Sequence, residues 1–181
     1  MKKALFAAVL SGLLGLVSLP AAASFVNFYN VSGWTQSLGG GSISVNGAPN
    51  TIRLTSSNDG DGPDYTDMTI KAIAAGTVSF NWSYVTSDRD GPSYDPFGWL
   101  LNTVFSQLSS DAGARNQSGK VSFNVKAGDV FGFRIFATDS SFGSATATVS
   151  NFAAPNKVPE PASLALIGLA LAAAGLVRRR R

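Results

Sequence analysis

The chain has neither cysteine nor histidine among its 181 residues. The lack of cysteine excludes disulfides and thiol nucleophiles, and the lack of histidine excludes imidazole bases and the usual zinc and copper ligands. The single glutamate is Glu160, near the C-terminus, so any acid chemistry between the two ends must use Asp, Tyr or Lys. Without disulfides this middle part must be stabilised by its own core, for which residues 24–157 are numerous enough.

Positive charge is also scarce between the two ends. The chain as a whole carries a net charge of +3, but residues 24–157 hold eight Lys or Arg and ten Asp, a net charge of about −2. The basic excess comes from Lys2, Lys3 and the four terminal arginines. No cluster of basic residues of the kind that neutralises phosphates is present in the middle of the chain. We therefore expect no nucleic-acid partner.

The first 23 residues have the pattern of a secretory signal peptide. Two lysines precede an apolar run from Ala4 to Leu19, and Ala21-Ala22-Ala23 supplies the small residues of a cleavage site. We predict that signal peptidase cleaves after Ala23, so that the mature chain starts near Ser24. The alternative is an uncleaved anchor helix, which Pro20 and the alanines do not favour.

The C-terminal end has the pattern of a membrane anchor. Residues 162–177 form an uncharged run of 16 residues, slightly shorter than the about 20 that span a bilayer. The cluster Arg178, Arg179, Arg180 and Arg181 follows directly, and the positive-inside tendency places it in the cytoplasm with the body outside. The sequence thus predicts a linker at 153–161, a transmembrane helix at 162–177 and a basic tail at 178–181.

The segment before this helix makes the prediction more specific. Val158, Pro159, Glu160 and Pro161, followed by a short Leu/Ala/Gly helix and an arginine cluster, resemble the PEP-CTERM sorting signal of Gram-negative bacteria, the substrate of exosortase. The resemblance implies that the inner-membrane anchor is transient and that exosortase cleaves near the motif. It also implies delivery to the cell envelope, the cell surface or an exopolysaccharide matrix, as in a biofilm. An ordinary tail anchor is the alternative.

The body, residues 24–152, has the alternating pattern of β-strands. In TVSFNWSYVT, residues 77–86, the apolar side chains occupy every second position. KVSFNVKA (120–127) and VFGFRIFAT (130–138) repeat this pattern around Ala-Gly-Asp and predict a hairpin. Shorter alternating segments, including the opening FVNFYNVS, predict further strands, whereas 98–108 fits either a strand or a turn of helix. We expect an all-β fold, a single β-sandwich or jelly-roll domain.

The body also resembles, at the level of the fold, secreted jelly-roll modules of the CUB or galactose-binding kind. The features that carry this resemblance are the early Trp34, the strand at 77–86 and the late segment AGDVFGFRIFATD. The chain departs from CUB domains because it lacks their paired cysteines. Such a resemblance implies a fold and transfers no function.

Two related loops hold most of the aspartates. DGDGPDYTD (59–67) and DRDGPSYDP (88–96) share Asp-x-Asp-Gly-Pro-x-Tyr. Clustered carboxylates on a glycine-containing loop suit calcium, which is the one cofactor that the sequence suggests, although neither loop completes an EF-hand. The alternative is that Asp-Gly and Gly-Pro only form turns. The candidate calcium ligands are Asp59, Asp61, Asp64, Asp67, Asp88, Asp90 and Asp95.

Aromatic residues beside these loops suggest contact with glycans. Tyr65, Tyr94 and Trp99 adjoin the aspartates, and exposed aromatics next to polar groups are typical of carbohydrate sites. For Trp99, as for Phe97, a place in the core is the favoured alternative. The delivery route makes exopolysaccharide a candidate partner. We expect a non-enzymatic binding or structural protein at the cell surface or in the extracellular matrix. The alternative is a secreted carbohydrate-active enzyme that uses Asp acids.

Overall fold

The computed structural model describes residues 24–156. The predicted signal peptide (1–23), the Val158–Pro161 motif, the helix at 162–177 and the basic tail at 178–181 lie outside these residues. Among the residues described, no helix has the length and apolar character needed to cross a membrane.

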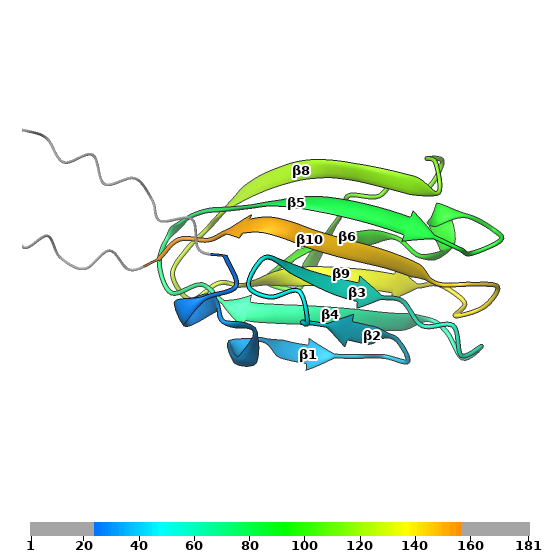
Figure 1. The fold of residues 1–181 in the computed structure, drawn as a ribbon, viewed down its shortest axis with the longest axis horizontal. Coiled ribbons are helices and arrows are strands. Elements are labelled where there is room, and N and C mark those ends of the chain that lie inside the picture. Colours follow the sequence, from blue (N-terminus) through cyan, green and yellow to red (C-terminus); the bar gives the residue numbers. More distant parts are fainter. Residues whose placement is uncertain (1–23, 157–181) are drawn as a thin grey trace, which may run out of the picture.

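The described chain folds into strands with three short 3-10 helices (Figure 1). The helices are η1 (Asn27–Tyr29), η2 (Val31–Gly33) and η3 (Pro92–Tyr94). The strands are β1 (Thr35–Ser37), β2 (Ser42–Ser44), β3 (Thr51–Thr55), β4 (Asp64–Lys71), β5 (Gly76–Thr86), β6 (Phe97–Leu101), β7 (Val104–Gln107), β8 (Asn116–Val125), β9 (Val130–Ala137) and β10 (Ala145–Ala153).

These strands form two five-stranded antiparallel sheets that pack face to face. The order is β1-β4-β9-β6-β7 in the first sheet, called the platform sheet below, and β2-β3-β10-β5-β8 in the second, called the hydroxyl sheet. Consecutive strands frequently belong to different sheets, so the chain crosses the core repeatedly. This arrangement confirms the predicted all-β sandwich.

The core between the sheets is rich in aromatic rings, as the alternation in the sequence predicts. Phe80 and Trp82 of β5 are buried, as are Phe131 and Phe133 of β9. The ring of Trp34 stacks on that of Phe133 with 5.5 Å between the centroids. Burial of each such side chain stabilises the fold by about 2 kcal/mol, which explains how the domain dispenses with disulfides.

The predicted hairpin of 120–127 with 130–138 is wrong. β8 pairs with β5 in the hydroxyl sheet, whereas β9 pairs with β4 and β6 in the platform sheet. Both strands have an apolar face that must be buried in the core. Because β8 and β9 lie in opposite sheets, their apolar faces point toward each other across that core. The rings of Phe123 and Phe131 then meet across the core, 6.3 Å apart and edge to face.

The structure also decides the conformation of two segments, 25–32 and 98–108. The opening segment, expected to be a strand, forms η1 and η2 instead. Asn27 has a left-handed φ of 53°, which interrupts an extended chain, and the Asn30 side chain caps η2 by accepting the Ser32 amide at 3.1 Å. The ambiguous segment 98–108 is a strand pair, β6 and β7. Asn102 and Thr103 form its tight turn, with φ values of 47° and 75°, which match the left-handed turn of a two-residue hairpin.

The two ends of the described chain lie at the same end of the sandwich (Figure 1). The Tyr29 hydroxyl donates to the Pro155 carbonyl oxygen at 2.7 Å and fastens the first turn to the last residues. The loops at 59–63, 88–96 and 139–143 gather at the opposite end, where β4 and β10 begin and β5 and β9 end. The sandwich thus separates its loop cluster from the place where the C-terminal segment leaves it.

Candidate functional site

The fold brings the two aspartate loops together. The loop 139–143 lies between them: the Gly60 amide donates to the Ser140 carbonyl at 2.7 Å, and the Arg89 amide donates to the Phe142 carbonyl at 3.1 Å. Arg115 donates to the carbonyls of Asp88 and Arg89 and holds the second loop from the other side. Segments 29 positions apart in the sequence therefore form one end of the molecule.

The first aspartate of each loop forms a turn. Asp59 Oδ1 accepts the amide of Asp61 at 3.1 Å, and Asp88 Oδ1 accepts the amides of Asp90 at 2.6 Å and Gly91 at 3.2 Å. The bond from Asp61 lowers the pKa of Asp59. A carboxylate that accepts the amide two residues further on is the usual Asx-turn. The repeated motif therefore has the same local role in both loops.

The other predicted calcium ligands have separate partners. Asp64 accepts the Ser140 hydroxyl at 2.9 Å, Asp90 lies 3.7 Å from the Arg89 guanidinium, and Asp67 is bound by Arg134. Asp95 is buried, and burial raises its pKa to about 6. Within residues 24–156, no three acidic side chains lie close enough to hold a metal ion. Calcium binding remains a prediction for which these carboxylates would have to move together.

The predicted glycan residue Tyr65 belongs to a more ordered group on the platform sheet. Its ring stacks on Phe136 with 4.7 Å between centroids and an angle of 11° between the planes. The Arg134 guanidinium lies 4.3 Å from the centre of the same ring. Tyr65 nevertheless stays 44% exposed. The ring is therefore held by two neighbours while a large part of the residue stays open to solvent.

Arg134 is fixed in turn by Asp67. Its Nε donates to Asp67 Oδ1 at 2.7 Å, and one terminal nitrogen donates to Oδ2 at 2.6 Å. These hydrogen bonds raise the pKa of Arg134 further above its usual range. The planar fork of arginine suits this two-point contact. The ion pair is electrically balanced and holds the guanidinium beside the Tyr65 ring.

The strand register explains why these four residues meet. Asp67 of β4 lies opposite Arg134 of β9, and Tyr65 lies opposite Phe136. Arg134 is also opposite Gly98 of β6, which has no side chain to cover the guanidinium. We call Tyr65, Asp67, Arg134 and Phe136 the aromatic platform.

The other two predicted glycan residues take different positions. Tyr94 lies next to the platform sheet, since its carbonyl accepts the Thr138 amide at 2.8 Å. Trp99 lies between the sheets, where its ring stacks on Phe123 at 3.9 Å. Only Tyr65 therefore belongs to the aromatic platform.

Sequence reasoning missed Arg134 and Phe136. Both alternate with the core residues Phe131, Phe133 and Ile135 in β9, so the period of two already placed them on the outer face. The pairing with Asp67, which lies 67 positions away in the chain, has no local signal. It follows only once β4 and β9 are known to be neighbours.

Comparison with known proteins identifies one part of the chain. Residues 157–181 match the family model of the PEP-CTERM protein-sorting motif. The chain thus carries a PEP-CTERM sorting motif, as the resemblance predicted. The motif indicates an exported protein that is sorted through the cell envelope and processed by exosortase. A search of curated protein sequences found no match.

Solved structures with a similar fold include several carbohydrate-binding modules. A family 35 module from an environmental isolate is 15% identical, with 68% of this chain and 93% of that one covered and a TM-score of 0.36. A family 35 module from Clostridium thermocellum is 12% identical, with 64% and 96% covered and a TM-score of 0.33. The N-terminal cellulose-binding domain of Cellulomonas fimi β-1,4-glucanase C is 10% identical, with 71% and 91% covered and a TM-score of 0.35. Similarity at this level assigns no function.

Proposed function

We propose that this exported protein is a non-catalytic binding protein of the cell surface or extracellular matrix, and that its aromatic platform binds polysaccharide. The observation that carries the proposal is the exposed Tyr65 ring, which Phe136 and Arg134 contact and hold on a sheet. The sorting motif supports it, because a protein delivered to the cell exterior meets polysaccharide there.

The platform has the chemistry that a neutral sugar needs. An aromatic ring packs against the C–H face of a sugar, and fixed polar groups at its margin bond the hydroxyls. Asp67 accepts hydrogen bonds from Nε and one terminal nitrogen of Arg134. The other terminal nitrogen has no acceptor within residues 24–156, and it is available to donate to a sugar hydroxyl. Because the sheet fixes these groups before the ligand arrives, little conformational entropy is lost on binding.

The alternative, a carbohydrate-active enzyme with Asp acids, is less well supported. A glycosidase needs one carboxyl with a raised pKa and a second one across an open cleft. Asp95 has the raised pKa, but it is 1% exposed and no sugar can reach it. Asp67 is exposed in part, but both of its carboxylate oxygens already accept hydrogen bonds from Arg134.

A glycan array probed with the full-length protein, followed by the same array with Tyr65→Ala, tests the proposal. We expect Tyr65→Ala to weaken binding by roughly tenfold, the equivalent of about 1.4 kcal/mol of lost stacking. Phe28→Ala is the matched control, because Phe28 is 59% exposed and lies in η1 at the far end of the sandwich. Binding that survives Tyr65→Ala, or an array on which the unaltered protein binds no glycan, would contradict the proposal.

A further inference from the structure

The outer face of the hydroxyl sheet differs in charge from the rest of the body. Its five strands contain no Asp or Glu, and their only charged residues are Arg53 in β3 and Lys120 in β8. All ten aspartates of residues 24–156 lie in the platform sheet or in loops. This face is therefore cationic although the body as a whole has a slight negative charge.

The same face consists mainly of hydroxyl and amide side chains. The register aligns Thr51, Ser150, Asn81 and Lys120 in one row across β3, β10, β5 and β8. The next row holds Arg53, Thr148, Ser83 and Ser118. Since adjacent strands lie about 4.8 Å apart, the two basic residues are separated by about 14 Å across the sheet.

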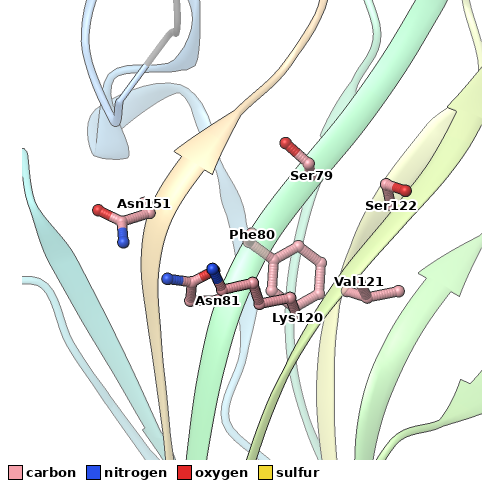
Figure 2. Close-up of a pocket in the computed structure, with 7 residues that line it drawn as sticks. All are labelled: Ser79, Phe80, Asn81, Lys120, Val121, Ser122 and Asn151. Atoms are coloured by element: carbon pink, nitrogen blue, oxygen red, sulfur yellow. The ribbon is translucent and has the colours of Figure 1, made fainter.

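A hollow interrupts this face beside β10. The pairing of β10 with β5 shifts between Ser150 and Ala153, and Asn151 has a left-handed φ of 48°. Such a bulge bends the strand away from its neighbour. The hollow has a volume of about 290 Å³. Its lining residues are Ser79, Phe80, Asn81, Lys120, Val121, Ser122 and Asn151 (Figure 2).

The polar groups around the hollow are free to bind a ligand. Lys120 forms neither of the two ion pairs found within residues 24–156. The side chains of Asn81, Asn151 and Ser122 make no hydrogen bond to the described part of the chain at the distances that define one, whereas Asn124 of the same strand accepts from Thr77 at 3.0 Å. Figure 2 shows Asn81 and Lys120 extending toward Asn151 on β10.

From these observations we propose that the hydroxyl sheet is a second binding face and that its ligand is an acidic polysaccharide. The carboxylate of a uronic acid residue lies against the Lys120 ammonium in the hollow. Its ring hydroxyls bond the amides of Asn81 and Asn151, and a further acidic residue of the same polymer meets Arg53. A hollow at the small end of the usual range of about 300–1,000 Å³ suits a single sugar unit. This face does not depend on the aromatic platform, which is electrically balanced and lies on the opposite side.

Polygalacturonate and its fully methyl-esterified form provide the test, because they share a sugar backbone and differ in charge. Binding of the full-length protein is measured at low salt and again at 0.5 M NaCl. We expect Lys120→Gln with Arg53→Gln to weaken binding to polygalacturonate by roughly tenfold and to leave Tyr65-dependent binding on the glycan array unchanged. High salt should weaken the binding of polygalacturonate to the unaltered protein by a similar factor, because the charges of Arg53 and Lys120 are exposed to solvent and are therefore screened.

Lys71→Gln with Lys126→Gln is the matched control, since it removes two exposed lysines outside the hydroxyl sheet strands. Equal loss in this control would show a general charge effect and overturn the proposal. So would equal binding to the esterified polymer, or no binding of polygalacturonate by the unaltered protein. Failure of the Tyr65→Ala experiment would leave this result unaffected, so the two proposals fail separately.

Discussion

Replacement of the buried Asp95 by asparagine should stabilise the protein at neutral pH. The Asp95 side chain is 1% exposed. Burial raises its pKa from 3.8 to about 6, and the negative charges of Asp88 and Asp139 act in the same direction. The hydroxyls of Ser56 and Thr86 oppose this shift by bonding the carboxylate. The folded protein therefore holds a carboxyl group that resists ionisation.

The sign of the pH dependence follows from this shift. Between pH 3.8 and about 6 the unfolded chain has released the Asp95 proton and the folded chain has kept it, so the free energy of unfolding falls as pH rises through this window. Above pH 6 both states are ionised and the loss is complete. A difference of about two pKa units corresponds to at most about 3 kcal/mol. Asparagine carries no charge and can still accept the neighbouring hydroxyls, so Asp95→Asn should recover this amount at pH 7.

Urea unfolding at pH 4, 5, 6 and 7, followed by the fluorescence of the buried Trp34 and Trp82, measures the effect. EDTA is kept in every sample so that calcium cannot contribute. The free energy of unfolding of Asp95→Asn should equal that of the unaltered protein at pH 4 and exceed it by about 3 kcal/mol at pH 7. Asp61→Asn, at an exposed position, should show no such growth. A difference that is independent of pH, or a variant less stable at pH 7, would refute the reasoning.

Three further predictions concern the metal, the packing and the sorting motif. Addition of EDTA should lower the melting temperature and calcium should restore it if the aspartate loops bind metal; identical melting curves would exclude a structural calcium there. Gly119→Ala should destabilise the fold by about 2 kcal/mol, because the added Cβ would lie 2.9 Å from the Trp82 indole nitrogen; urea unfolding measures this, and an unchanged midpoint would contradict it. Glu160→Ala should keep the protein in the membrane fraction, whereas continued release from cells lacking exosortase would contradict exosortase processing.

The sequence predicted the strands far better than their partners. Alternation alone identified β5, β8 and β9 and the side chains that they bury, because a strand with one face in a core must alternate. The same pattern is compatible with pairing within one sheet or with crossing to the other. The turn between β8 and β9 is equally short in both cases, so only the packing of Phe123 against Phe131 across the core distinguishes them.

Of the candidate sites, only the one formed by local turns could be predicted from the sequence. The Asp-x-Asp-Gly-Pro repeat was visible in the sequence, and its turn chemistry in Asp59 and Asp88 is local. The aromatic platform depends on β4 lying beside β9, and the hollow depends on a bulge in β10. Neither feature has a short-range pattern, since each arises from strands that meet only in the folded sheet.

The two proposed faces lie on opposite sides of one β-sandwich, and their chemistry differs. The platform offers a neutral aromatic surface, whereas the hydroxyl sheet offers, among hydroxyls and amides, two basic residues that form no ion pair within residues 24–156. Packed sheets lie about 10 Å apart, so one domain could hold a neutral and an acidic polysaccharide at a fixed separation without an oligomer. The viscosity of a mixture of the two polymers should therefore rise when the unaltered protein is added. Loss of either Tyr65 or Lys120 should leave binding to one polymer intact and abolish this rise, because bridging needs both faces while binding needs only one.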